Sequence, residues 1–334
     1  MASISTSSES AGGDRLALGA FTGAVLIGGT NFVAVRISNR GLDPLWGAGL
    51  RFALAAVLFG LVCAAFRVAL PRGRALAFSA AYGGLAFAGV YGCLYWALRD
   101  VPAGVAAVVF AVGPLLVLLL AVAHGLERLS RRALGGALVV LAGSAVIFVQ
   151  PGSFSFGWQS VALLVVGALC AAESVIVSKL AGPQHPAAVN VVGASVGALV
   201  LVAASVVAGE ELVLPAAREA QIALVYLVAA TVGLFLLVLL VVQRWAASAT
   251  SYLFVLMPVV AIAVGAVVAG EPVTATTVAG AAIVAGGVYV GAVRPSTRVS
   301  RRAGIRARLR RRAPSGTPRV AAARPAPGTR TARA

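Results

Sequence analysis

The stretch AVGPLLVLLLAVAHGLE, residues 111–127, has a close counterpart in VLMPVVAIAVGAVVAGE, residues 255–271. Each stretch is an apolar run in which a proline stands thirteen residues before a glutamate, and the two copies lie 144 residues apart. Further matches at an offset of 143 or 144 join Gly136 to Gly280, Gly143 to Gly287, Arg36 to Lys179 and Asn31 to Ser174. The pattern predicts two copies of one structural unit.

The composition places both copies in a membrane. Of 334 residues 60% are hydrophobic and 11% charged, with a mean hydropathy of +0.98. Soluble domains are nearer half apolar and about 25% charged, so the apolar surplus is expected to face lipid. A spanning helix needs about 20 apolar residues. We predict ten spans, at roughly 15–37, 45–66, 74–98, 101–123, 133–149, 157–179, 187–208, 220–243, 247–269 and 273–293. A soluble bundle would need amphipathic stripes, which these runs lack.

Five spans in each copy make the second copy enter the membrane from the opposite side. The predicted fold is therefore an all-α polytopic membrane protein with ten transmembrane helices as two inverted five-helix repeats, an architecture of secondary transporters. The alternative is a duplication that serves only the assembly of the fold and has no role in transport. The predicted parts are an N-terminal segment 1–14, repeats 15–149 and 150–293, and a tail 294–334.

Basic residues predict the orientation. Of the net charge of +17, thirteen arginines lie in the tail, which contains no acid. Positive loops stay in the cytoplasm, so we expect both termini there, in a plasma or inner membrane. The tail is expected to be disordered and to contact anionic lipids rather than specific nucleic acid. The inner side would hold Arg67, Arg72, Arg74, Arg128, Arg131, Arg132, Lys179 and Arg244, and the outer side Arg36, Arg40, Arg99 and Arg218.

The segment YWALRDVPAGVAAVVFAVGPLLVLLLAVAHGLERLSRRALGGALVVLAG, residues 95–143, resembles the end of an EamA domain of the drug/metabolite transporter superfamily. AGEPVTATTVAGAAIVAGGVYVG repeats that ending, and GGTNFVAVRIS and LWGAGLRFALAAVLFGL are similar to the first two helices of the family. The resemblance covers about 15–293. It implies export of a small metabolite, amino acid or drug by alternating access, although some members of the superfamily import.

Other function classes have less support. No nucleotide-binding P-loop is present, so a proton or solute gradient is the expected energy source. We expect no enzyme activity, cofactor or metal, because Cys and His are few and scattered. GASVG, residues 193–197, fits both the nucleophile elbow and small-residue helix packing, and packing is the preferred interpretation. An intramembrane enzyme and a non-transporting scaffold remain the alternative classes. The sequence does not indicate the oligomeric state.

Glu173 is the most informative candidate for the site. It lies within the apolar part of the sixth span, where an acid costs about 2.5–3.5 kcal/mol to insert and usually lines a cavity or relays protons. Ser174 stands beside it. Either a proton or cationic-substrate site or a structural partner for an arginine or a helix backbone would explain this acid.

Three more polar residues lie in the outer part of the first three spans. Arg51 would recognise an anion or form a gating pair, or it would serve as an anchor or helix clamp, with a side chain long enough to reach toward the interface. Asn31 needs a neighbouring helix or a substrate as partner. Tyr91 is the expected cavity residue, whereas Tyr95 and Trp96 are expected in the interfacial aromatic belt.

The repeated prolines Pro114 and Pro258 are expected to kink their helices at equivalent positions. Their symmetry favours a role in gating. Glu127 and Glu271 fall at span ends on opposite faces, where capping or pairing is favoured over substrate binding.

Overall fold

The computed structural model describes residues 5–126, 131–148, 157–181, 184–244 and 252–290, and no strand occurs in these ranges. The first half contains α1 (Ser5–Ser38), α2 (Pro44–Ala65), α3 (Arg74–Gly83), the π-helix η1 (Gly84–Gly89), α4 (Val90–Ala97), α5 (Ala103–Phe110), α6 (Gly113–Ala123) and α7 (Arg131–Phe148). The second half contains α8 (Trp158–Ala181), α9 (Pro186–Ala208), α10 (Arg218–Arg244), α12 (Tyr252–Val268) and α13 (Ala275–Val288).

Seven stretches are long and apolar enough to cross a membrane: Leu16–Ser38, Pro44–Ala65, Arg74–Ala97, Ala103–Ala123, Trp158–Ala181, Pro186–Ala208 and Arg218–Val238. They coincide with seven of the ten predicted spans, and they confirm the division between residues 98 and 103. The other three predicted spans coincide with shorter apolar helices at Leu134–Gly143, Leu256–Val268 and Ala275–Gly287. A count of ten spanning helices therefore stays a prediction.

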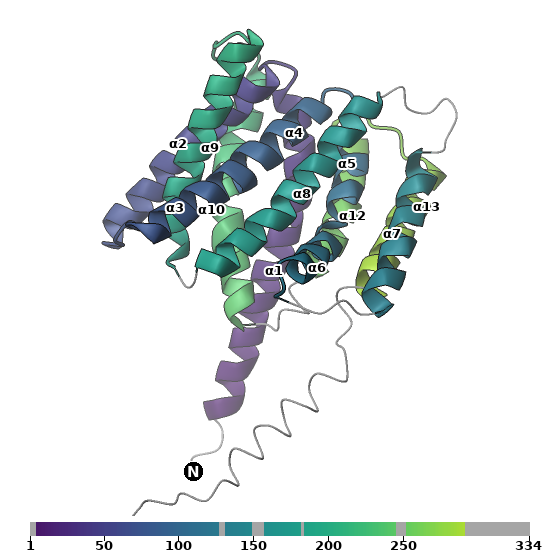
Figure 1. Ribbon diagram of the computed structural model, residues 1–334, viewed down its shortest axis with the longest axis horizontal. Helices are drawn as coiled ribbons and strands as arrows, with labels where there is room; N and C mark the ends of the chain where they lie inside the picture. Colours follow the sequence, from purple (N-terminus) through teal and green to yellow (C-terminus); the bar gives the residue numbers. More distant parts are fainter. Residues whose placement is uncertain (1–4, 127–130, 149–156, 182–183, 245–251, 291–334) are drawn as a thin grey trace, which may run out of the picture. The chain divides into compact units, whose positions relative to one another are not determined.

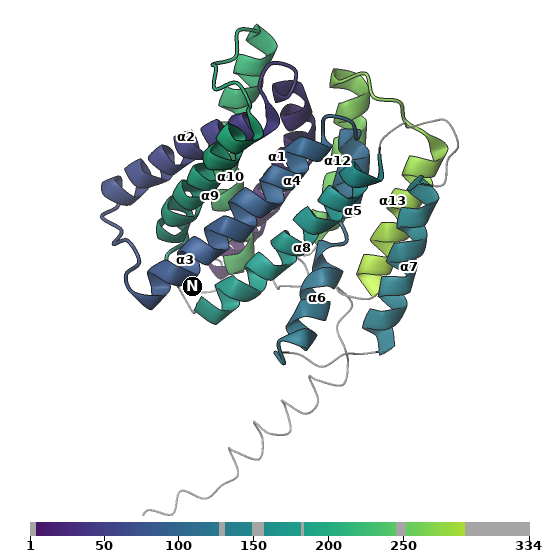
Figure 2. The ribbon, with the colours of Figure 1, turned by 45° about the horizontal axis from the view of Figure 1, so that its top comes forward.

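The contacts between helices keep the same pattern when the two halves are exchanged (Figure 1). Helix α1 packs on α10 and α12 of the second half, and α8 packs on α3, α4 and α6 of the first. The pairs α2–α9, α5–α12 and α7–α13 each join equivalent helices. Figure 2 shows α7 and α13 side by side again, as in Figure 1. This arrangement fits a two-repeat layout.

The pairing of α7 with α13 depends on the repeated glycines. A Cβ atom at Gly143 would lie 2.9 Å from the backbone nitrogen of Val284, and one at Gly287 would lie 2.9 Å from that of Val140. Val140 and Val284 are themselves 144 residues apart. The two contacts are therefore the same contact made once from each half, and only a residue without a side chain permits them.

The glycines of GASVG also serve packing. A Cβ at Gly197 would lie 2.4 Å from Cβ of Phe87, and one at Gly193 would lie 3.0 Å from the Phe87 ring. The Cα of Gly193 in turn lies where a side chain on Gly83 would stand. The interpretation of this motif as small-residue helix packing is confirmed, because α9 approaches α3 and η1 closely along it.

We expect Gly287→Ala to lower the apparent melting temperature of the purified protein by several degrees. The added methyl group would meet backbone atoms of Val140 and Gly136, which cannot move aside without separating α7 from α13, and overpacking of this kind costs about 1–3 kcal/mol. Gly286→Ala is the matched control, because nothing lies within 4 Å of its Cβ position. Equal melting temperatures for the two variants would contradict the close helix pairing.

Candidate functional site

Arg51 is fully buried, with 1% of its surface exposed, although it stands in a helix of a membrane protein. Its Nε donates to Thr231 Oγ1 at 3.0 Å, its Nη2 to Asn31 Oδ1 at 2.8 Å, and its Nη1 to the Tyr95 hydroxyl at 3.4 Å. Thr231 in turn donates to the Leu227 carbonyl at 2.7 Å. The side chain thus joins α2 to α1, α4 and α10. These contacts fit the interpretation of Arg51 as a helix clamp, whereas the buried side chain does not reach toward the interface.

Two aromatic rings complete the surroundings of Arg51. The guanidinium carbon lies 5.0 Å from the ring centroid of Phe52 and 4.8 Å from that of Tyr91, within the range of cation–π contacts. The two rings meet edge to face. Tyr95 is completely buried, so its assignment to the aromatic belt is wrong. The sequence predicted neither Thr231 nor Phe52 as part of this cluster.

A cavity of about 450 Å³ lies next to this cluster. Both halves of the chain contribute to its wall, as the repeat predicts for a transporter site. Among the candidate residues Asn31, Tyr91 and Pro114 line it, and Arg51 lies behind Asn31 and Tyr91. Most of the other wall residues are apolar: Gly28, Phe32, Val90, Leu94, Phe110, Val117, Leu118, Ala168, Ala171, Ala172, Val175, Leu234 and Met257.

Glu173 does not line this cavity but forms an ion pair beside it. Its Oε1 lies 3.3 Å from Nε2 of His124, which follows the end of α6. Both side chains are partly exposed, at 29% for Glu173 and 39% for His124. The expected structural partner of Glu173 was an arginine or a helix backbone, but its partner is a histidine. Ser174 is buried and donates to the Ala171 carbonyl at 2.7 Å, so its own helix satisfies its hydroxyl.

The chemistry of the His124 ring defines where one proton lies. Nδ1 of His124 is 2.9 Å from the Leu120 carbonyl oxygen, which can only accept, so Nδ1 must carry a hydrogen. In the neutral imidazole Nε2 would then be an acceptor facing a carboxylate. A hydrogen bond between Nε2 and the Glu173 carboxylate then requires one further proton, on either of the two groups.

The two prolines differ in local structure. Helix α5 ends at Phe110 and α6 begins at Gly113, so the helix is interrupted at Ala111 and Val112. Pro114 stands in the first turn of α6, where its missing N–H costs no backbone hydrogen bond within that helix. Pro258 lies inside the continuous helix α12. The predicted interruption is confirmed at Pro114, where the helix breaks within the apolar span Ala103–Ala123, whereas α12 continues through Pro258. A gating role for either proline stays a prediction.

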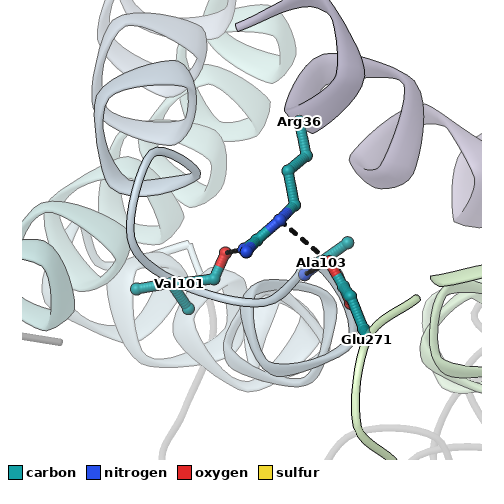
Figure 3. A network of polar contacts seen from close by, with 4 residues as sticks. All are labelled: Arg36, Val101, Ala103 and Glu271. Atoms are coloured by element: carbon teal, nitrogen blue, oxygen red, sulfur yellow. Dashed lines mark hydrogen bonds and ion pairs between the residues drawn. The ribbon is translucent and has the colours of Figure 1, made fainter. Parts of the chain in front are cut away.

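A second group of polar contacts joins Arg36, Val101, Ala103 and Glu271, and we call it the Arg36–Glu271 network (Figure 3). Arg36 Nε lies 3.2 Å from Glu271 Oε1, and Nη1 of Arg36 donates to the Val101 carbonyl at 2.5 Å. The same Glu271 oxygen accepts the backbone N–H of Ala103 at 2.9 Å, at the start of α5. A carboxylate is stabilised at a helix N-terminus. The network thus ties α1 and α5 of one half to the end of α12 in the other.

The turn that follows α12 positions the Glu271 side chain in this network. Gly270 has a positive φ of 65°, and the N–H of Glu271 donates back to the Gly265 carbonyl at 3.0 Å, which is a glycine-terminated helix end. Gly265 leaves room for the carboxylate, because a Cβ there would lie 2.6 Å from Oε2 of Glu271. The predicted pairing at a span end is confirmed for Glu271, whereas Glu127 lies outside the described residues.

Comparisons with known proteins agree with this architecture. A family model described as the EamA-like transporter family matches residues 15–149 and again residues 158–292. The chain is 30% identical over 260 residues to the uncharacterized inner membrane transporter YedA of Escherichia coli, a match that covers 76% of this chain and 83% of that protein. It is 32% identical over 141 residues to a probable terminal-alkyne amino-acid exporter of Streptantibioticus cattleyicolor, with 40% of this chain and 46% of that protein covered.

A solved structure titled only as the crystal structure of a protein has the same fold. Its TM-score is 0.61 at 22% identity, and the match covers 87% of this chain and 99% of that one. The double match of the family model covers most of the chain, as the repeat predicts, and the seven long apolar helices fit a multi-pass membrane protein. The chain belongs to the EamA-like transporter family of the drug/metabolite transporter superfamily.

Proposed function

We propose that this protein is a secondary transporter that exports a small organic metabolite, with the cavity beside Arg51 as its substrate site. The observation that carries the proposal is the cavity itself, because its wall comes from both halves of an internally repeated chain. Exchange of roles between two such halves is the basis of alternating access. An importer in the same fold is the alternative.

The described conformation fits a transporter whose outer end is closed. With the orientation expected from the positive loops, the Arg36–Glu271 network lies on the outer side, and Leu98 and Val101 beside it are fully buried. At the opposite end Lys179, which is the repeat counterpart of Arg36, is exposed. We therefore assign this conformation to the inward-facing state.

Two further features bear on direction and energy source. One relative is named as an amino-acid exporter, which favours outward movement of a compound of similar size. The contact between His124 and Glu173 supports coupling to a proton gradient, because ionisable groups within membrane-spanning helices recurrently serve as proton sites. Contact between the arginine-rich tail and anionic lipids also remains a proposal, since the tail lies outside the described residues.

The transport function is tested by blocking the cavity. An overexpressing strain is screened for resistance to a panel of amino acids, amino-acid analogues and organic acids, and the cell content of each active compound is measured by mass spectrometry. Val117→Trp fills the cavity wall and should abolish every resistance that the wild type confers. Val57→Trp is the control, because Val57 is 60% exposed on α2. Equal resistance with wild type and Val117→Trp would contradict the assignment of the site.

A further inference from the structure

The buried charge of Arg51 has only neutral partners. Its hydrogen bonds go to a threonine, an asparagine and a tyrosine, and no carboxylate in the described part of the chain forms an ion pair with it. Removing a guanidinium from water is costly unless a counter-charge or strong acceptors compensate. A site with one uncompensated positive charge therefore gains free energy when an anion enters beside it.

Asn31 lies between the Arg51 guanidinium and the cavity. Its Oδ1 accepts from Arg51, so the Nδ2 group must point the other way, and no described residue accepts from it. Asn31 lines the cavity, as does Tyr91, whose ring lies against the guanidinium. The polar part of this wall thus presents donors, backed by a cation, to whatever the cavity holds.

The remaining wall is apolar and carries no acid. Phe32, Leu94, Phe110, Leu234 and Met257 line it, and Glu173 is held by His124 outside the lining. Such a wall offers no counter-charge to an ammonium group, and one arginine balances one negative charge rather than two. A compact apolar body with a single carboxylate is the ligand that matches these surroundings.

We propose that the cavity binds a monocarboxylate with a compact apolar body, and that Arg51, through Asn31 and Tyr91, is the group that selects the carboxylate. The proposal rests on the transport function proposed above and names its substrate class. It further implies that an amino group on the ligand is not required for binding, so a simple carboxylic acid should bind at least as tightly as the amino acid with the same side chain.

The first test compares four compounds that share one isobutyl body. The full chain is purified into lipid nanodiscs, and its melting temperature is measured with 4-methylpentanoate, L-leucine, L-leucinamide and isoamylamine. We expect 4-methylpentanoate to raise the melting temperature as its concentration rises, L-leucine to raise it by the same amount or less, and the last two compounds to leave it unchanged. Stabilisation by leucine but not by 4-methylpentanoate would overturn the claim that the amine is dispensable. Stabilisation by the amide or the amine equal to that by the acids would overturn the proposal.

The second test supplies Arg51 with an internal counter-charge. Asn31→Asp places a carboxylate where Oδ1 now lies, 2.8 Å from the guanidinium. We expect it to weaken binding of both acids by at least about tenfold, while the melting temperature without ligand stays the same or rises. Gln221→Glu adds the same charge at an exposed position and should bind as the wild type does. If the acids bind Asn31→Asp as tightly as they bind the wild type, the proposal fails.

Binding and transport are measured separately, so the two proposals fail separately. Carboxylate binding that is lost in Asn31→Asp, in a protein that moves none of the bound acids across a proteoliposome membrane, would support the site and overturn the transport function. Transport of amines or neutral compounds blocked by Val117→Trp, without carboxylate binding, would support the transport function and overturn the inference.

Discussion

Replacing Glu271 with glutamine is expected to raise the rate at which a reagent added outside reaches the cavity by about five- to thirtyfold. Glutamine keeps an oxygen for the Ala103 N–H but loses the charge that holds Arg36. Breaking a fully buried ion pair costs about 3–5 kcal/mol. Because the Arg36 side chain is 26% exposed and that of Glu271 7%, we expect about 1–2 kcal/mol here. Since about 1.4 kcal/mol is a tenfold change in an equilibrium constant, the outward-open population should rise accordingly.

The reporter is a cysteine at Val117 in the cavity wall, in a protein whose Cys63, Cys93 and Cys170 are replaced by alanine. An impermeant maleimide is added to intact cells and labelling is followed over time. Glu219→Gln is the matched control, because it removes an exposed pair in which Arg40 Nη1 and Glu219 Oε2 lie 4.0 Å apart. Such surface pairs contribute little. Equal labelling rates in the two variants would exclude the Arg36–Glu271 network as an outer closure.

The same labelling experiment checks the orientation of the protein in the membrane, and therefore whether the Arg36–Glu271 network lies on the outer side. A cysteine at Leu212, which is exposed in the connection between α9 and α10, should react at once from outside. A cysteine at Arg72, before α3, should stay unlabelled until the membrane is permeabilised. The reverse result would place both termini on the outside and make the described state outward-facing.

The repeat and the helical class could be predicted from sequence because both are one-dimensional patterns. A proline and a glutamate at a fixed spacing, written twice, need no knowledge of packing. An offset of 143 pairs Arg36 with Lys179, and one of 144 pairs Glu127 with Glu271. It did not reveal that Arg36 binds Glu271, because that contact crosses from one copy to the other and depends on how the helix ends meet.

The position of a residue along its helix could be predicted from the sequence, but the direction in which its side chain points around the helix axis could not. The sequence places Arg51 near one end of its span, and it lies there in α2, yet whether its side chain reaches water or the bundle depends on Thr231, Asn31 and Tyr95 on three other helices. Tyr95 was assigned to the interface for the same reason. His124 was judged only as a metal ligand, and the fact that α6 ends beside the middle of α8 is a tertiary property.

The second large effect is expected at Glu173. Glu173→Gln keeps the shape of the side chain and can still hydrogen-bond to His124, but it cannot release a proton. If the shared proton couples transport, the wild type in proteoliposomes should concentrate substrate about tenfold for each pH unit across the membrane, since one pH unit is worth about 1.4 kcal/mol per proton. The variant should lose this accumulation and still exchange labelled for unlabelled substrate at equal pH. Glu211→Gln, which removes an exposed acid, should behave as the wild type does.

The alternatives for Glu173 give different results in the same assays. If its carboxylate binds a cationic substrate, accumulation and exchange should fall together in Glu173→Gln. If it only fixes α8 to α6 through His124, the variant should lose melting temperature while accumulation per folded molecule persists. His124→Gln extends the test, because a proton shared between Nε2 and Oε1 requires both groups, and we expect the same loss of accumulation. Full accumulation in both variants would exclude the His124–Glu173 pair from the coupling mechanism, whatever the stability of the protein.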